Sequence, residues 1–103
     1  MAGHTPVRVA HALRDLGMHV RAWRQLRGLS QAQVGLRARV SEQTVRTVEA
    51  GTGSVSSENL LRIMLVVGVL DDMVTAIDPM ESPLGRARAQ DLLPKRVRKR
   101  ASA

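Results

Sequence analysis

Apolar residues recur along much of the chain at spacings of three and four, which is the period of a helix with one buried face. A first helix, starting at His11 or Gly17 and ending at Arg27, is predicted by such a stripe: Leu13, Leu16, Val20 and Trp23. Gly28 follows it directly, where a left-handed C-cap is expected. Residues 1–10 lack this periodicity and are predicted to be a flexible arm.

Two short helices are predicted next, over Ser30–Ala38 and Ser41–Glu49. Ser30 and Gln33 match a capping box, in which the serine hydroxyl caps the helix and the glutamine reaches back to the serine amide. Gly51 ends the second of these helices. That helix has two inward-facing valines, Val45 and Val48, and a polar outer face, Glu42, Gln43, Arg46 and Thr47.

Two further helices complete the predicted domain. Ser56 caps the fourth helix, and Gly68 ends it. The fifth runs from Asp71 to Ile77 and stops at Asp78-Pro79, because proline disfavours a helical conformation at the residue before it. We therefore predict an all-α, five-helix domain over residues 11–78, followed by a basic, flexible tail over residues 79–103. A helical turn at Leu84 to Leu93 is an open alternative within this tail.

Composition narrows the function classes. The 103 residues fit one domain with a tail, and 44% of them are hydrophobic, which permits a packed core. The chain has no cysteine, so disulfides and thiolate metal sites are excluded. Its histidines, His4, His11 and His19, have no acidic cluster at metal-ligand spacing, so neither a metal, a cofactor nor an enzyme activity is expected. No apolar run in the sequence reaches about 18 residues, so no membrane span is predicted. The N-terminus lacks the basic-then-apolar order of a signal peptide, and a cytoplasmic protein is therefore expected.

The charge is unevenly placed along the chain. The net charge is +7, and residues 79–103 hold seven Lys or Arg against two acids. A basic protein attracts polyanions, with nucleic acid as the first candidate and an anionic membrane surface as the second. The basic run of the tail is Lys95, Arg96, Arg98, Lys99 and Arg100, which suits either phosphate contacts or a protein partner. Composition alone favours the alternative of a solvated, disordered tail that aids solubility.

Two short helices joined by a tight turn are typical of a helix-turn-helix, whose second helix enters the DNA major groove. From the pattern alone, an ordinary helical hairpin with a solvated polar face is equally compatible. Four segments, however, resemble the Cro/repressor (XRE-type) helix-turn-helix family in order and spacing: Val20-Arg21-Ala22-Trp23-Arg24, Gly28-Leu29-Ser30-Gln31, Val40-Ser41-Glu42-Gln43-Thr44-Val45 and Glu49-Ala50-Gly51. The resemblance covers residues 16–70 and implies a sequence-specific, double-stranded DNA-binding regulator, expected to be a repressor.

The resemblance also implies roles for single residues. Gln31 and Ser41 match positions that contact phosphate, and Arg24 and Glu49 match a structural ion pair. The positions that face bases or begin the recognition helix are matched by Glu42, Gln43, Thr44, Arg46 and Thr47. Chemically, Gln43 suits adenine, Arg46 suits guanine or a phosphate, and Glu42 suits a cytosine amine. For Glu42, an acid favoured by the helix dipole is the alternative.

Four residues depart from the family pattern. Val55 stands where a proline is common and Ser57 where a large apolar residue is common, and the other two are Arg39 and Gly35. Arg39 occupies the turn position where the family usually has glycine, and since a positive φ is uncommon for other residues, a reshaped turn is an open alternative. Gly35 replaces the usual alanine, which keeps a close helix approach but lowers helix propensity by about 1 kcal/mol.

Two partners besides DNA are considered. A homodimer is expected because one short recognition helix reads few bases, and apolar residues are available for its interface: Val66, Val69, Leu70, Met73, Val74 and Ile77. Asp78-Pro79, Ser82-Pro83-Leu84 and the basic run resemble HipB-like antitoxins paired with HipA-like kinases. That resemblance implies an antitoxin with a toxin kinase as its partner, as the alternative to an autonomous repressor.

Overall fold

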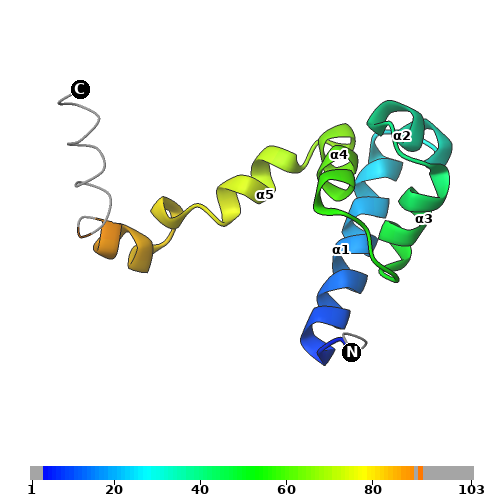
Figure 1. Ribbon diagram of the computed structural model, residues 1–103. Helices are drawn as coiled ribbons and strands as arrows, with labels where there is room; N and C mark the ends of the chain where they lie inside the picture. The colour runs from blue at the N-terminus through cyan, green and yellow to red at the C-terminus, as the bar shows by residue number, and fades with distance from the viewer. Residues whose placement is uncertain (1–3, 90, 92–103) are drawn as a thin grey trace, which may run out of the picture. The chain divides into compact units, whose positions relative to one another are not determined.

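The computed structural model describes residues 4–89 and 91, and these residues form helices and connecting loops without a strand (Figure 1). The all-helical expectation is therefore confirmed for the described part of the chain. The helices are α1 (Val7–Leu26), α2 (Gln31–Ala38), α3 (Glu42–Ala50), α4 (Ser57–Val67), α5 (Leu70–Ala76) and the 3-10 turn η1 (Pro79–Glu81). Contacts divide the chain into two compact units, residues 1–70 and 71–103, which are described separately.

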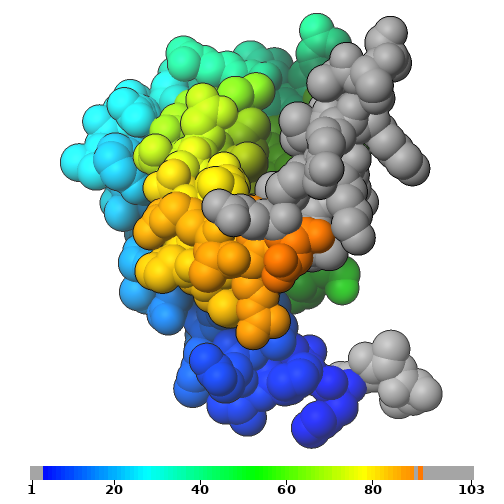
Figure 2. Space-filling model, turned by 90° about the vertical axis from the view of Figure 1, so that its left-hand side faces the viewer, coloured from blue at the N-terminus to red at the C-terminus, as the bar shows by residue number. Residues whose placement is uncertain are grey.

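Helix α1 begins at Val7, so the expectation that residues 7–10 belong to an unstructured arm is wrong. Pro6 occupies the N-cap position with φ −56°, and its carbonyl accepts the Ala10 amide at 3.0 Å. No side chain caps this end, so the sequence carries no capping signal there. The first turns of the helix, blue in Figures 1 and 2, are exposed, with Val7 at 68%.

The next three helices start where their serines predict. The Ser30 hydroxyl accepts the Gln33 amide at 3.0 Å while the Gln33 side chain accepts the Ser30 amide at 2.8 Å, which completes the capping box. Ser41 and Ser56 cap α3 and α4 by accepting the Thr44 and Asn59 amides, without the reciprocal bond of a capping box. Gly51 and Gly68 end these helices in the left-handed region.

The turn between α2 and α3 keeps the left-handed conformation although it has no glycine there. Arg39 adopts φ 59° and ψ 45°, and the Val40 amide donates to the Gly35 carbonyl at 3.0 Å. The turn is therefore not reshaped. A side-chain carbon on Gly35 would lie 2.9 Å from the Val40 carbonyl oxygen, which is too close for an ordinary contact. Gly35 thus lets the turn fold tightly back on α2.

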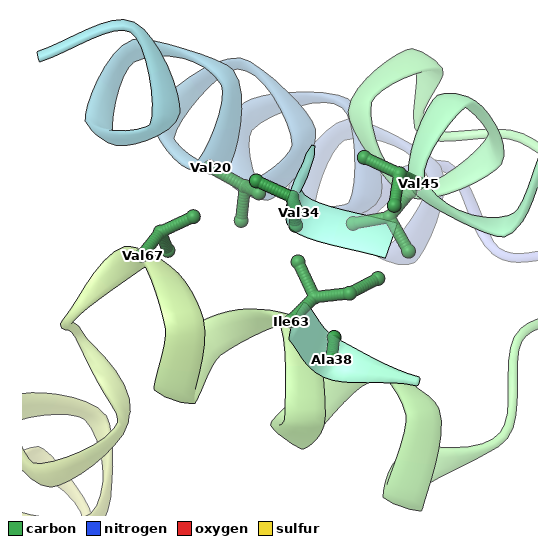
Figure 3. Close-up of a cluster of buried hydrophobic side chains, with 7 residues drawn as sticks. Val20, Val34, Ala38, Val45, Ile63 and Val67 are labelled. Carbon is green, nitrogen blue, oxygen red and sulfur yellow. The ribbon is translucent and has the colours of Figure 1, made fainter. Parts of the chain in front are cut away.

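Helices α1 to α4 enclose an aliphatic core (Figure 3). Its five largest fully buried side chains point toward one another: Val20, Val34, Val45, Ile63 and Val67. Helices α1 and α3 approach especially closely, since a side chain on Gly17 would collide with the carbonyl oxygens of Val48 and Glu49. The core thereby fixes α3 by backbone contact as well as by side chains.

Arg27, the C-cap residue of α1, joins the end of that helix to the end of α4. Its Nε donates to the Val67 carbonyl at 3.1 Å, and its guanidinium lies 5.1 Å from the centre of the Trp23 ring. Any side chain on Gly68 would run into the same guanidinium. The Arg27 side chain therefore covers the C-terminal end of α4 and bonds to its last carbonyl group.

The second unit is helical as far as it is described. Asp78 caps η1 by accepting the Met80 amide at 2.9 Å. Residues 83–89 form another helix, which overlaps the helical turn from Leu84 left open within the predicted tail. Arg86 donates to the Met80 carbonyl at 2.8 Å, and Gly85 packs directly on the Pro79 carbonyl. The basic run at residues 95–100 lies outside the described residues. By its contacts, α5 after Leu70 groups with this unit, whereas the sequence placed it in the domain ending at residue 78.

Candidate nucleic-acid interface

The inner face of α3 is held by a buried ion pair. Arg24 Nε donates to Glu49 Oε2 at 2.6 Å and Arg24 Nη2 to Glu49 Oε1 at 3.0 Å, and the two side chains are only 11% and 4% exposed. The remaining terminal nitrogen of Arg24 donates to the Leu29 carbonyl at 2.9 Å. No buried side-chain polar atom of the described residues lacks a partner. The pair expected from the family resemblance is therefore present, and it links α1, the α1–α2 loop and α3.

Gln31 belongs to the same network. Its Nε2 donates to Glu49 Oε1 at 3.0 Å, so its amide is fixed at the start of α2 rather than free in solvent. The sequence placed Gln31 at a phosphate-contacting position without this bond. The amide keeps one further N–H and its carbonyl oxygen, so a phosphate contact and the Glu49 contact are chemically compatible.

Ser41 and Thr44 together shape the start of α3. The Ser41 hydroxyl accepts the Thr44 amide at 3.0 Å and lies 2.8 Å from the Thr44 hydroxyl. Both side chains are therefore engaged locally. The other amides of this first turn point out of the helix start, where a negatively charged group is favoured.

The outer face of α3 carries a second, exposed network. Arg46 Nη1 donates to Glu42 Oε2 at 2.8 Å, and Arg46 Nη2 donates to Gln43 Oε1 at 3.0 Å. The Arg46 and Glu42 side chains are 47% and 48% exposed. These three predicted base-facing residues thus lie together and contact one another.

Thr47 differs from them because it is half-buried. Its hydroxyl donates to the Gln43 carbonyl at 2.9 Å, and its methyl group lies close to Gly53 in the loop after α3. Thr47 also lines an apolar cavity of about 60 Å³ between α1, α3 and this loop. The sequence placed Thr47 on the outer face with Gln43, but the loop covers part of it.

Ala50 is an exposed residue that the helix predicted from the sequence did not include. Helix α3 continues through Ala50, one residue past the predicted end, and Ala50 follows Gln43 and Arg46 at helical spacing on the outer face. The signal was present in the sequence, because Gly51 as a left-handed C-cap places Ala50 in the last turn. Because the side chain of Ala50 is only a methyl group, it projects little from the C-terminal end of the outer face.

Other site types are not seen in the part of the chain that the structure describes. It contains no group of three or more side chains able to hold a metal ion. None of its helices is long and apolar enough to cross a membrane. Both statements cover residues 4–89 and 91.

Comparison with known proteins agrees with this geometry. A sequence model of the helix-turn-helix domain family matches residues 15–77, which contain α2, α3 and the turn between them. No curated protein and no solved structure matched the chain. The family match spans more than half of the chain. The chain therefore belongs to the helix-turn-helix domain family of DNA-binding proteins.

Proposed function

We propose that the protein is a sequence-specific, double-stranded DNA-binding transcriptional regulator that acts as a repressor in the cytoplasm through a five-helix, repressor-like domain. One observation carries this proposal. Helix α3 presents an exposed polar face, while the buried Arg24–Glu49 pair and the close approach at Gly17 fix its inner face. A rigid helix with outward polar side chains meets the requirement of a major-groove reader.

The proposed roles follow the placement of the side chains. Gln43 and Arg46 read bases, since they are exposed and lie on the outer face of α3. Gln31 and Ser41 contact phosphates, because they stand at the starts of α2 and α3, where backbone amides favour anions. Thr47 supports Gln43, to whose carbonyl it donates a hydrogen bond.

A homodimer is part of the proposal. Helix α5 has only seven residues and no buried one, and Val74 and Ile77 are 53% and 77% exposed. So short a helix is marginal in water on its own, and a second copy would cover its apolar residues. Val66 and Val69, which the sequence offered for the same interface, instead pack against the core of the first unit. Sedimentation of the protein on a two-fold duplex would show two subunits.

The basic run of the tail is proposed to strengthen binding without setting sequence preference. Its five basic residues suit phosphates, which carry no sequence information directly. Deleting residues 95–103 should flatten the plot of log affinity against log salt, by about 0.9 for each phosphate that the tail neutralises in the full-length protein. An unchanged slope would remove this role.

The direct test uses Gln43→Ala and Arg46→Ala on a duplex selected from a random pool. Each variant should bind more weakly by about 1–3 kcal/mol and relax the preference at one base pair, because the truncated side chain no longer reaches its base. Arg62→Ala is the matched control, since Arg62 is an exposed arginine of α4 in a similar glutamate pair. If both α3 variants bind selected and random DNA as the parent does, α3 is not the reader.

An antitoxin is the second candidate, and one observation favours it. The second unit is compact, yet its described part leaves four large apolar side chains exposed: Val74 at 53%, Ile77 at 77%, Met80 at 45% and Leu84 at 65%. Such a surface fits a protein partner, here a HipA-like toxin kinase. Co-purification with a kinase encoded beside this chain, abolished by Met80→Asp, would support the antitoxin. DNA binding without any such partner would leave the autonomous repressor.

A further inference from the structure

We propose that the contacts among Glu42, Gln43 and Arg46 make α3 a reader of guanine and set Glu42 as the positioning residue for Arg46. The proposal rests on the DNA-binding function proposed above and names the base class that its site recognises. Of the roles expected from residue types alone, it narrows that of Arg46, which suited guanine or a phosphate, to guanine. It departs from the other two, in which Gln43 suits adenine and Glu42 suits a cytosine amine.

The first step counts donors and acceptors on the outer face. A guanidinium has five N–H groups and no acceptor, and two of those of Arg46 are engaged, with Glu42 Oε2 and Gln43 Oε1. Three N–H groups remain for DNA, and a bidentate contact needs two. The carbonyl oxygen of Gln43 already accepts from Arg46, and the amide nitrogen of Gln43 lies 3.4 Å from the Thr47 hydroxyl with a second N–H to spare. Gln43 and Arg46 therefore offer donors to the groove.

The second step matches these donors to base edges. In the major groove, guanine presents two acceptors, N7 and O6, whereas adenine presents one acceptor and one amine donor. Bidentate recognition of adenine needs the carbonyl oxygen of Gln43 as an acceptor, and Arg46 already uses one of the two lone pairs of that oxygen. The adenine amine would therefore share this oxygen with a guanidinium. Adenine would also leave N7 as the single acceptor for the donors of this face, and a donor left unpaired is costly in a desolvated interface. Guanine offers these donors two acceptors and no competing donor, so its major-groove edge fits this face better than that of adenine.

The third step concerns Glu42. A lone carboxylate beside phosphates is repelled, but here the charge of Glu42 is offset by Arg46 at 2.8 Å. The pair also restricts a long, flexible side chain before DNA arrives, so less ordering is left to the binding step. Glu42 acts through Arg46 and reads no base itself. Its removal is therefore expected to lower discrimination while raising affinity for DNA of any sequence.

The chain contains a matched control for this effect. Glu58 and Arg62 on α4 form an ion pair at the same spacing of four residues, with a contact of 2.6 Å. Glu58→Gln and Glu42→Gln change the net charge equally, and each breaks one exposed Glu–Arg pair. Only Glu42→Gln removes the charge that holds an arginine on the outer face of α3. A difference between the two variants in base preference therefore reports on positioning rather than on charge.

The experiment starts with selection of duplexes from a random pool by the full-length protein. Each guanine of the enriched half-site is then replaced by 7-deazaguanine, which lacks the N7 acceptor, or by adenine, and affinities are measured by fluorescence anisotropy. We expect one guanine whose replacement costs about tenfold in affinity. We expect Glu42→Gln to lower the guanine-over-adenine ratio at that position toward one, and Glu58→Gln to leave the ratio unchanged. Thermal melting followed by circular dichroism confirms that both variants fold.

The outcomes separate this inference from the function on which it rests. If no sequence is enriched over random DNA, the proposed sequence-specific function fails, and this inference fails with it. If a sequence is enriched but contains no guanine sensitive to 7-deaza replacement, only the guanine assignment is overturned. If a sensitive guanine exists but Glu42→Gln keeps the parental ratio, the positioning role of Glu42 is overturned.

Discussion

Helix α3 takes part in two arginine–glutamate pairs, one on each of its faces. On the inner face, Glu49 meets Arg24 of α1 at 2.6 Å, with side chains 4% and 11% exposed. On the outer face, Glu42 meets Arg46 of the same helix at 2.8 Å, and both side chains are nearly half exposed. The residue types and distances are similar, but the surroundings differ. The buried pair therefore fixes the inner face of the helix, whereas the side chains of the exposed pair stay free to change partners.

Solvent explains this difference. Exposed ion pairs contribute little to the stability of the fold, because water and salt screen the charges and the side chains lose rotational freedom. In a buried pair, both charges have already been desolvated, so removing one partner leaves the other uncompensated. The inner pair is therefore expected to govern stability, and the outer pair to govern recognition.

The largest predicted effect follows from breaking the inner pair. Glu49→Ala should lower the free energy of unfolding by about 3–5 kcal/mol, because Arg24 would stay buried without its carboxylate. Urea unfolding followed by circular dichroism measures this change. The double variant Arg24→Met, Glu49→Leu should recover much of the loss, since it buries no charge. A loss below about 1 kcal/mol for Glu49→Ala would show that the pair is not desolvated as the structure indicates.

The next effect tests the close approach beside that pair. Gly17→Ala should cost about 1–3 kcal/mol, because the added carbon meets the backbone carbonyls of Val48 and Glu49, which cannot rotate away. Met18→Ala is the control, since Met18 is the next residue along α1 and is 60% exposed. Equal melting temperatures for the two variants would contradict the packing of α1 on α3.

A smaller effect, of opposite sign, is expected at the turn that leads into α3. Arg39→Gly should raise the free energy of unfolding by about 0.5–1 kcal/mol, because glycine adopts the left-handed conformation without a steric penalty. Arg37→Gly makes the same substitution inside α2 and should instead cost about 1 kcal/mol. If both variants are destabilised alike, the left-handed conformation of Arg39 is not what limits the turn.

The smallest effect is expected on the outer face. Glu42→Ala should change the free energy of unfolding by no more than about 0.5 kcal/mol, since its pair with Arg46 is exposed and local. The same urea titration compares it directly with Glu49→Ala. Similar losses for the two variants would abolish the distinction between the faces.

Local signals explain how much of this fold the sequence predicts. Ser30, Ser41 and Ser56 mark helix starts because a serine hydroxyl caps the backbone within three residues of itself. Gly51 and Gly68 mark helix ends because left-handed caps favour glycine. The start of α1 at Val7 was missed because Pro6 offers no capping side chain. Capping therefore decided which boundaries were predictable.

Features that depend on several segments at once were not predictable. The conformation of Arg39 depends on Val40 folding back on Gly35, and the half-burial of Thr47 depends on the path of the loop at Gly53. Residue types indicated the members of the outer face, but they did not show that Arg46 donates to the side-chain carbonyl of Gln43. These contacts arise only once the chain has folded.

The junction where Arg27 lies over Trp23 has a practical consequence. Trp23 is the only aromatic residue of the chain, so its indole accounts for all near-ultraviolet emission, with no tyrosine background. The guanidinium 5.1 Å from its ring is tied to the Val67 carbonyl at the end of α4. Separation of α1 from α4 would move that cation away and change the emission wavelength and the fluorescence lifetime of Trp23. The fluorescence of Trp23 therefore reports whether α1 and α4 are in contact.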